Sequence, residues 1–550
     1  GDHRDLHSFP TRRSSDLYLD NIVAFLRTQF PQKGDEELQS FVHKVIREKL
    51  KRPKTTIIRH PSPGNSELVD VDLLTHIKEH SRRIIAPCGT VYKSTDEQTA
   101  FDKQFIDMLR NNRDVAKKAM LRYAAEGRDV EKSLEDFKQA LCKILVNSII
   151  GSNGNDKNAM YDLEAFNGVT SLARHGIIAA YAYVERFLTA NFYFPDIEHA
   201  INYIITTKHY CPNVEVIRGI TNKYSLANPL PGEVAEALCS SINNYNSHTH
   251  KNLRRLEAIL ENMPQHEVTF VHYSRNLYNL FTYNTEFWKR WIADFLDTRS
   301  EIRPEDCTEI DPNNIRKIDG DLIQVIATVH ADILKGTQVK DTAKKEDCHH
   351  IAQYLTAVGM RMQEKLDSIS DILNTFLHNK AFVAHIHSQR NIIRKCVGIS
   401  DTDSVIFTTK HLTSWYLNNE FKFSQETYNI NAFIVYLLTK SIASFIEKMA
   451  ISRGATGDNV GMIEMKNEFM YPVLIKTGIG KHYAGDYTIQ EGNVLPTPKT
   501  EIKGGSFMSS NRPKVTHDYT KKILNKIKVD MLETCELHLN DYILLAYDHE

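Results

Sequence analysis

Two aspartates, Asp401 and Asp403, stand two positions apart in the stretch GISDTDSVIF, which runs from Gly398 to Phe407. The flanking residues are β-branched or aromatic, which predicts two short strands joined by a tight polar turn. Alternate residues of a strand share a face, so the two carboxylates should point the same way and repel each other unless a cation lies beside them. Mg²⁺ is typically bound by one or two carboxylates together with substrate phosphates. The pair therefore indicates metal-assisted phosphate chemistry.

The Asp-x-Asp pattern alone leaves other interpretations open. Aspartate is a favoured turn residue, so the same stretch is compatible with an exposed acidic turn that binds nothing. Glycosyltransferases also use such a pair to hold the metal of a nucleotide. The motif by itself does not choose the reaction.

A second set of suitable residues lies on two neighbouring segments with helical periodicity. Arg113 and Lys117 are spaced i, i+4 on the first segment, as are Lys143 and Asn147 on the second, with Ile150 about one turn further on. Residues four apart share a helix face, and two helices joined by a short connection run antiparallel. Their polar faces could converge on a nucleoside triphosphate beside its metal. Two solvated helix faces are the alternative, because such spacing is common.

The elements that must position these residues follow from apolar periodicity and turn residues. Helices are expected over 18–51, 97–125, 130–150 and 172–188, a mostly helical stretch over 206–390, mainly strands over 391–510, and a final basic amphipathic helix from about 519. The chain has 550 residues, enough for several domains, and a formal net charge of −1, so any basic surface must be local. Its eight cysteines form no CxxC pair, which is typical of reduced intracellular thiols. No apolar run approaches the length of a membrane span.

The first residues, GDHRDLHSFPTRRSSDL, have no apolar period and no hydrophobic middle like that of a signal peptide. They resemble the in-frame translation of a sequencing adapter. Residues 1–17 are therefore expected to be an artefact.

Four stretches, in this order, resemble motifs of family B DNA polymerases, with phage replicative enzymes the most similar. KILVNSIIG resembles Lys-x3-Asn-Ser-x-Tyr-Gly, SDTDS resembles Asp-Thr-Asp-Ser, GKHYAG resembles Lys-Lys-x-Tyr-Ala, and IKGG resembles the Lys-Gly pair that precedes the thumb. The resemblance covers about 18–205 and 391–550, and the four motifs together are far more specific than any one of them.

This resemblance implies an α+β fold with the palm and fingers of a right-hand polymerase, a large helical insertion and a truncated thumb. The segments it implies are an artefact (1–17), a palm portion leading into the fingers (18–96), fingers helices (97–155), a palm helix region (156–205), the insertion (206–390), the palm with the metal-binding hairpin (391–510) and the start of the thumb (511–550). A protein of this family would carry out template-directed DNA synthesis in the cytoplasm, or in the host cytoplasm if the source is viral. Its partners would be primer–template DNA, dNTPs and other replication proteins, with no membrane.

The resemblance also implies roles for individual residues. Asp403 and Asp401 would be catalytic and would hold two Mg²⁺ ions. The triphosphate and nascent base pair would be bound by Arg113, Lys117, Lys143, Asn147 and Ile150. Lys481, Tyr483, Lys503 and Gly504 would contact the primer–template duplex.

The sequence departs from the family pattern at several positions. Ile150 replaces the tyrosine that lies beside the nascent base pair, Ile399 and Ser400 replace Tyr-Gly, and Gly480 replaces a lysine. The upstream motif that supplies a further aspartate, Asp-x-x-Ser-Leu-Tyr-Pro, has only a weak imitation at Asp70, and no exonuclease segment is recognised. The chain is therefore expected to be an inactive fragment of the enzyme. A non-catalytic DNA-binding replication factor is the alternative, and a glycosyltransferase would leave NSIIG and GKHYAG unexplained.

Three further stretches have competing interpretations. The aromatic-rich segment 273–296 could stack on single-stranded DNA, but buried helical core is favoured. Cys348, His349 and His350 lack the second spaced ligand pair of a zinc site. The lysines of TKKILNKIK, residues 520–528, fit either a phosphate-facing helix or a solvated one.

Overall fold

The computed structural model describes residues 22–24, 26–27, 30–48, 54–62, 65–72, 75–76, 79, 84–93, 97, 100–242, 250–379, 386–401, 404–452, 455, 457–462, 465–490, 493–504, 513–538 and 540–542. The expected artefact at 1–17 lies outside them. The chain divides into two compact units, and each is described by itself. Among the described residues, the first unit contains His43–Gly176 and Lys448–Met462, and the second contains those of Arg12–Val42, Ile177–Glu447 and Ile463–Glu550.

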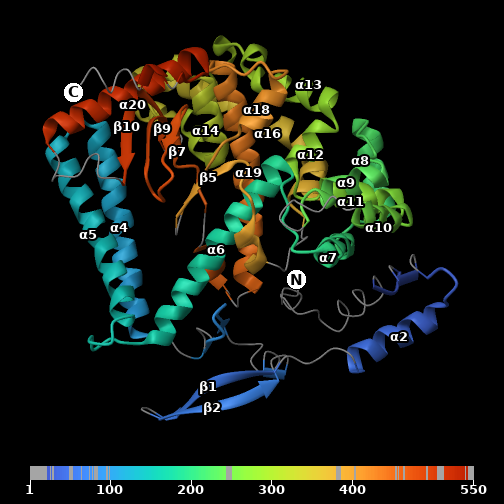
Figure 1. The fold of residues 1–550 in the computed structure, drawn as a ribbon. Helices are drawn as coiled ribbons and strands as arrows, with labels where there is room; N and C mark the ends of the chain where they lie inside the picture. Colours follow the sequence, from blue (N-terminus) through green and yellow to red (C-terminus); the bar gives the residue numbers. More distant parts are fainter. Residues whose placement is uncertain are drawn as a thin grey trace. The chain divides into compact units, whose positions relative to one another are not determined.

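Two small hairpins begin the first unit. Strands β1 (Lys54–Ser62) and β2 (Asn65–Asp72) pair antiparallel (Figure 1). Strands β3 (Ile84–Ile85) and β4 (Val91–Tyr92) form a second antiparallel pair. Asp70 lies in β2, where its carboxylate accepts a 2.6 Å hydrogen bond from the Thr56 hydroxyl.

Two long helices, α4 (Phe101–Ala125) and α5 (Asp129–Asn153), form a hairpin and lie side by side in Figure 1. Leu109 and Ala116 of α4 and Ile149 of α5 are buried. The short connection contains Gly127 at φ +68°, a backbone conformation that glycine adopts without strain. The antiparallel helix pair expected from periodicity is therefore present, and α6 (Leu163–Thr189) follows it.

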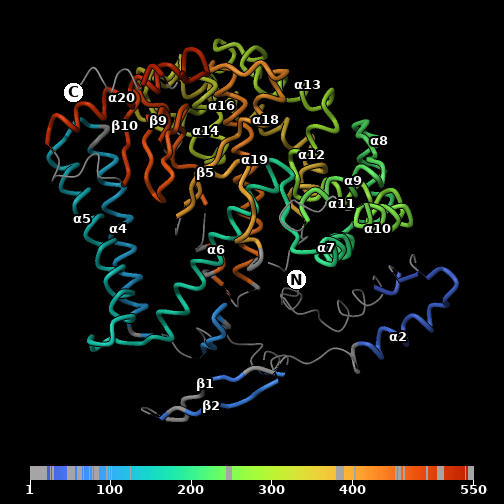
Figure 2. Tube along the Cα trace, in the orientation of Figure 1, coloured from blue at the N-terminus to red at the C-terminus, as the bar shows by residue number. Residues whose placement is uncertain are grey.

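Helices fill most of the second unit between 197 and 377, and Figure 2 traces them from green to yellow. They are α7 (Ile197–His209), α8 (Val214–Tyr224), α9 (Pro231–Cys239), α10 (His250–Glu261), α11 (Gln265–Tyr273), α12 (Leu277–Thr282), α13 (Thr285–Leu296), α14 (Gly320–Val329), α15 (Ala331–Leu334), α16 (His349–Ser368) and α17 (Ser370–Ile372). Helix α2 (Asp35–Glu48) precedes them in the chain, and its Leu38 and Val42 pack with Val23.

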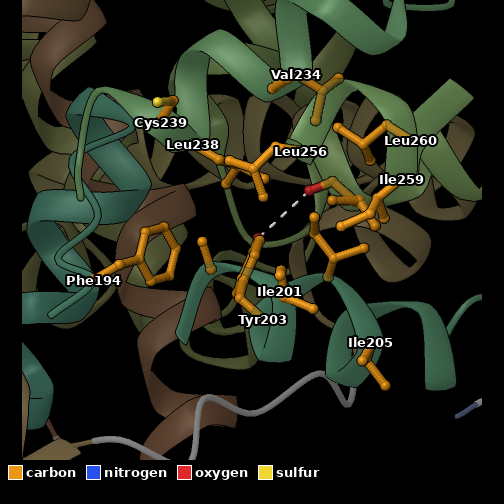
Figure 3. Packing of buried hydrophobic residues seen from close by; sticks show 14 of the residues in the cluster. Phe194, Ile201, Tyr203, Ile205, Val234, Leu238, Cys239, Leu256, Ile259 and Leu260 are labelled. Atoms are coloured by element: carbon orange, nitrogen blue, oxygen red, sulfur yellow. Dashed lines mark hydrogen bonds between the residues drawn. The ribbon is translucent and has the colours of Figure 1, made fainter. Parts of the chain in front are cut away.

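The helices α7, α9, α10 and α11 enclose a core of side chains that point toward one another in Figure 3. Leu256 is fully buried, and Ile201 and Leu238 are nearly so. The Tyr203 hydroxyl lies in this apolar cluster and donates to the Val271 carbonyl oxygen at 3.4 Å, which satisfies its buried polar group.

Two sheets lie in the C-terminal part of the second unit. Strands β5 (Val397–Ser400) and β6 (Val405–Phe407) form an antiparallel hairpin. The larger sheet has the order β10-β9-β7, with β8 also paired to β9; its strands are β7 (Phe469–Met470), β8 (Leu474–Lys476), β9 (Tyr483–Gln490) and β10 (Asn493–Lys503).

The expectation that strands dominate 391–510 is wrong, because α18 (Lys410–Tyr416) and the long α19 (Gln425–Ser452) lie there. Ile430, Phe433, Ile434 and Leu437 are fully buried at the spacing of one helix face. The β-branched residues of this run resemble a buried strand in sequence, but its length is that of a helix.

Helix α19 also corrects the expectation that no apolar run reaches the length of a membrane span. By length and composition alone it could cross a membrane. Within the described structure, 61% of its apolar window is buried, and the core helix of a globular domain passes the same test.

Helix α20 (Lys514–Thr534) begins five residues before the expected start at 519. Its Lys528 is buried and forms a 2.5 Å ion pair with Asp486 of β9. This lysine therefore fixes α20 to the sheet.

Candidate functional site

The acidic turn lies between β5 and β6. Ser400 pairs with Val405, and the Asp401 N–H donates to the Ser404 carbonyl oxygen at 2.9 Å, which closes the hairpin. The Asp401 side chain is 37% exposed, so its carboxylate is accessible to a cation. Asp403 lies outside the described residues, and the expected turn is confirmed for Asp401 alone.

The strand that leads to this turn is held by a buried carboxylate, that of Glu185 on α6. Its oxygens accept hydrogen bonds of 2.7–3.0 Å from the backbone N–H groups of Lys395, Cys396 and Val397. Asn191 adds a fourth donor, with its side-chain nitrogen 2.6 Å from Glu185 Oε2. Hydrogen bonds to a charged acceptor are among the stronger ones in proteins. Glu185 therefore fixes the start of β5, four residues before Asp401.

Sequence reasoning did not identify Glu185. It lies in the segment AYVERFL, an amphipathic helix in which a charged residue usually faces solvent. The only local signal is a glutamate between the apolar residues Val184 and Phe187, both of which are buried.

A lysine from the second sheet contacts the acidic turn directly. The Lys481 ammonium lies 2.8 Å from Asp401 Oδ1, and Lys476 donates to the Gly398 carbonyl oxygen at 3.2 Å. Lys481 adopts φ +64° in the turn between β8 and β9. Asp401 and Lys481, which belong to two different motifs about eighty residues apart in the sequence, are therefore adjacent.

The pairing of β9 with β10 joins the remaining expected DNA-contacting residues. Lys503 lies opposite Tyr483 in the register, and Gly504 follows at φ +64°. A Cβ on Gly504 would lie 2.6 Å from the Lys481 carbonyl oxygen and 2.4 Å from the His482 ring. The structure thus brings Lys481, Tyr483, Lys503 and Gly504 to one end of this strand pair.

Glu501 organises this strand end. Its carboxylate pairs with Lys503 at 3.2 Å and accepts from the hydroxyls of Tyr483, at 3.4 Å, and Tyr471. Burial, followed by the charge of Glu501, raises the pKa of Tyr483 to about 12, so the phenol stays protonated at neutral pH. Its single proton is directed at the Glu501 carboxylate, so the hydroxyl oxygen is left to accept a hydrogen bond from a ligand.

The triphosphate candidates all lie on the α4–α5 hairpin of the first unit. Lys143 and Asn147 are exposed on α5, while Arg113 and Lys117 of α4 are half-buried. The Nε atom of Arg113 is buried and has no hydrogen-bond partner among the residues that the structure describes. Ile150 is half-buried on the same helix as Lys143. The hairpin therefore presents polar donors from both helices.

The aromatic segment 273–296 and the residues around His349 each had two interpretations from sequence. In the aromatic segment, Tyr273, Phe281, Trp288 and Phe295 are fully buried, so the favoured core assignment is confirmed. His349 is half-buried, with Nε2 3.2 Å from the Ala343 carbonyl oxygen. Across the part of the chain that the structure describes, no group of three or more His, Cys, Asp or Glu side chains could hold a metal ion.

The donor chemistry at the acidic turn fits Mg²⁺ as far as it is described. Asp401 offers hard oxygen ligands and is partly exposed, but the Lys481 ammonium lies 2.8 Å from its Oδ1, so a metal ion would bind there in competition with this lysine. One carboxylate cannot complete a site alone, and Asp403 is the nearest further acid in the sequence.

Comparison with protein families identifies the same broad family as the four sequence motifs. The family model of divergent family B DNA polymerases matches residues 13–550. No curated protein and no solved structure matches the chain. Because the family match spans nearly the whole sequence, the chain belongs to the divergent family B DNA polymerases.

Proposed function

We propose that this protein carries out template-directed DNA synthesis, with the acidic turn as its catalytic centre. The observation that carries the proposal is the 2.8 Å contact between Asp401 and Lys481, because it joins a candidate metal turn to a candidate DNA-tracking strand pair.

In this proposal Asp401 and Asp403 hold two Mg²⁺ ions. Such ions would stabilise the charges on the attacking and leaving oxygens of an in-line displacement. The primer 3′-hydroxyl attacks the α-phosphate of a dNTP, a new phosphodiester bond forms, and pyrophosphate leaves. Glu185 positions the strand that precedes the turn and contacts no reactant, so it is a positioning residue.

The α4–α5 hairpin would act as the fingers. Arg113, Lys117, Lys143 and Asn147 would bind the triphosphate, and Ile150 would lie beside the nascent base pair. The hairpin carries these donors on adjacent helices, as such binding requires. In the same proposal, residues 391–510 form the palm, α20 begins the thumb and 206–390 is a helical insertion in a right-hand arrangement.

The duplex would run along the end of β9 and β10. Lys481 and Lys503 are exposed there and would neutralise backbone phosphates, while Tyr483 would lie beside the duplex with its hydroxyl held by Glu501. Gly504 permits the close approach of this strand end to Lys481.

A non-catalytic DNA-binding replication factor is the second candidate. It is favoured by one observation: the Lys481 ammonium already balances the charge of Asp401, so this carboxylate needs no metal ion. This alternative does not explain why the candidate triphosphate-binding residues of α4 and α5 are present.

Primer extension separates the two candidates. The chain, and any longer product of the same reading frame, is assayed with Mg²⁺, dNTPs and a primer–template duplex, alongside Asp403→Ala and Lys481→Ala. We expect extension to require Asp403, with duplex affinity unchanged in Asp403→Ala and lower in Lys481→Ala. Salt-sensitive duplex binding without extension in every form would establish the non-catalytic alternative, and extension by Asp403→Ala would exclude the acidic turn from catalysis.

A further inference from the structure

Helix α5 of the first unit carries an exposed apolar stripe. Its members are Val130, Leu134, Phe137, Leu141 and Ile144, and Val130 and Phe137 keep 81% and 65% of their surface exposed. Their spacing alternates between four and three positions, which is the heptad spacing of helices that pack along their length against another helix. The outer face of a solvated helix is normally polar. The stripe therefore indicates a helical interface.

Helix α4 extends this apolar surface. Three of its large apolar side chains are exposed: Phe105, Met108 and Val115. Val115 directly precedes the buried Ala116, and Leu141 directly precedes Cys142, which is half-buried and lies two turns before the buried Ile149. One position turns a helix by about 100°. Because the helices are antiparallel and their buried sides face each other, the same step back turns both stripes to one face of the hairpin.

The opposite face of the hairpin is polar. Lys117 follows Ala116 by one position and Lys143 follows Cys142 by one position, so both lysines turn away from the stripes. Asn147 lies about one turn beyond Lys143 on the same side. These three proposed triphosphate residues and the apolar face therefore lie on opposite sides, and the apolar face has no part in the proposed function.

The charges of α5 make this face complementary to itself. Residues 129–136 carry four acids and one lysine, whereas residues 137–153 carry two lysines and no acid. Two α5 helices packed antiparallel bring the acidic half of each beside the basic half of the other, and parallel packing would bring like charges together. An antiparallel pair of identical helices has two-fold symmetry, which is the commonest symmetry of soluble homo-oligomers.

The size of the face also suits a dimer. Each helix has 25 residues and is therefore about 37 Å long, and two helices side by side are about 20 Å wide. The face thus covers about 700 Å², close to the roughly 800 Å² that each partner buries in a stable complex.

We propose that the apolar face of the α4–α5 hairpin binds the same face of a second copy of this chain. The two α5 helices run antiparallel, and the two hairpins together form a four-helix bundle whose core is built by the stripes. The polar face of each hairpin, with Lys143 and Asn147, stays accessible in this dimer.

The first test is analytical ultracentrifugation of the full chain over a range of concentrations, with Phe137→Asp and Val515→Asp as matched variants. We expect the parent chain to dimerise and Phe137→Asp to raise the dimer Kd at least tenfold, because it buries an unpaired charge in the interface. Val515 of α20 is 67% exposed, much like Phe137, and its variant should dimerise as the parent does. A monomeric parent, open-ended oligomers, or an unchanged Kd in Phe137→Asp would each overturn the proposal.

Thiol cross-linking tests the orientation of the two helices. Phe137 is at the middle of the stripe, so it lies near its counterpart in an antiparallel pair, whereas Val130 is at one end and about 20 Å along the axis from its own counterpart. Phe137→Cys should therefore form a covalent dimer with a short bismaleimide and Val130→Cys should not, above the background of the parent chain with its eight cysteines. Efficient cross-linking of Val130→Cys, or none of Phe137→Cys, would overturn the antiparallel interface.

Discussion

The carboxylate of Glu185 accepts a 2.7 Å hydrogen bond from the backbone N–H of Val397, although the two residues are 212 positions apart. Val397 opens β5, and Asp401 follows that strand. The position of the acidic turn thus depends on a residue of α6 that no motif identifies. A buried carboxylate with four donors is satisfied only while this segment keeps its conformation.

Glu185→Gln tests this dependence. The amide group replaces one acceptor oxygen by a donor, which then faces the N–H groups of Lys395 or Asn191. We expect a loss of about 2 kcal/mol in the free energy of unfolding, as is typical when a buried donor loses a charged acceptor. Hydrogen exchange at Cys396 and Val397 should accelerate in the same variant.

The control for that experiment is Glu198→Gln. Glu198 is exposed and pairs with Arg255, so its loss should change stability by less than about 1 kcal/mol. Unchanged exchange at Cys396 and Val397 in Glu185→Gln would show that the carboxylate does not hold β5.

Gly504→Ala tests the close approach of the two strand ends. Alanine at φ +64° is strained by roughly 1–2 kcal/mol, and its Cβ would lie 2.6 Å from the Lys481 carbonyl oxygen. We expect lower stability and weaker duplex binding, because the turn that carries Lys481 must move. Urea unfolding and filter binding measure the two effects.

Gly480→Ala is the matched control, because a Cβ there meets nothing within 4 Å and the residue is in the same turn region. It should leave both quantities nearly unchanged. If the two alanine variants behaved alike, the contact at Gly504 would have no role in shaping this surface.

Local features of this fold could be predicted from sequence, and long-range ones could not. The α4–α5 hairpin and the turn at Asp401 follow from periodicity and turn residues that lie within a few positions of one another. The sequence predicts strands where helix α19 lies, because its β-branched residues are compatible with either structure.

The candidate site could likewise be predicted from sequence only in part, because its contacts join distant residues. The resemblance named Asp401 and Lys481, but only the folded chain brings them to 2.8 Å. The contacts of Glu185 with 395–397 and of Glu501 with two tyrosines join residues from different elements, and a single sequence contains no record of them.

The triphosphate residues are tested by Lys143→Ala and Arg113→Ala. Both should raise the apparent KM for dNTP strongly, by tenfold or more, since each removes a charge-assisted hydrogen bond to phosphate, while duplex affinity stays constant. Lys118→Ala is the control, because this exposed lysine lies on a different face of α4 from Arg113 and Lys117. A fall in duplex affinity at constant dNTP KM would assign these residues to DNA binding instead.

His330 makes the stability of the helical region depend on pH. The residue is fully buried, neither ring nitrogen has a hydrogen-bond partner among the described residues, and burial lowers its pKa to about 4. The unfolded chain binds a proton near pH 6.5 and the folded chain does not, so the free energy of unfolding falls as pH drops from about 6.5 toward 4. Between neutral pH and pH 5 this single group should lower the free energy of unfolding by about 2 kcal/mol.

His330→Phe should abolish that part of the acid sensitivity, whereas exposed His350→Gln should retain it. Urea unfolding at pH 7.5 and pH 5 measures the difference, and an identical pH dependence in His330→Phe and the parent chain would show that His330 does not titrate between its folded and unfolded states.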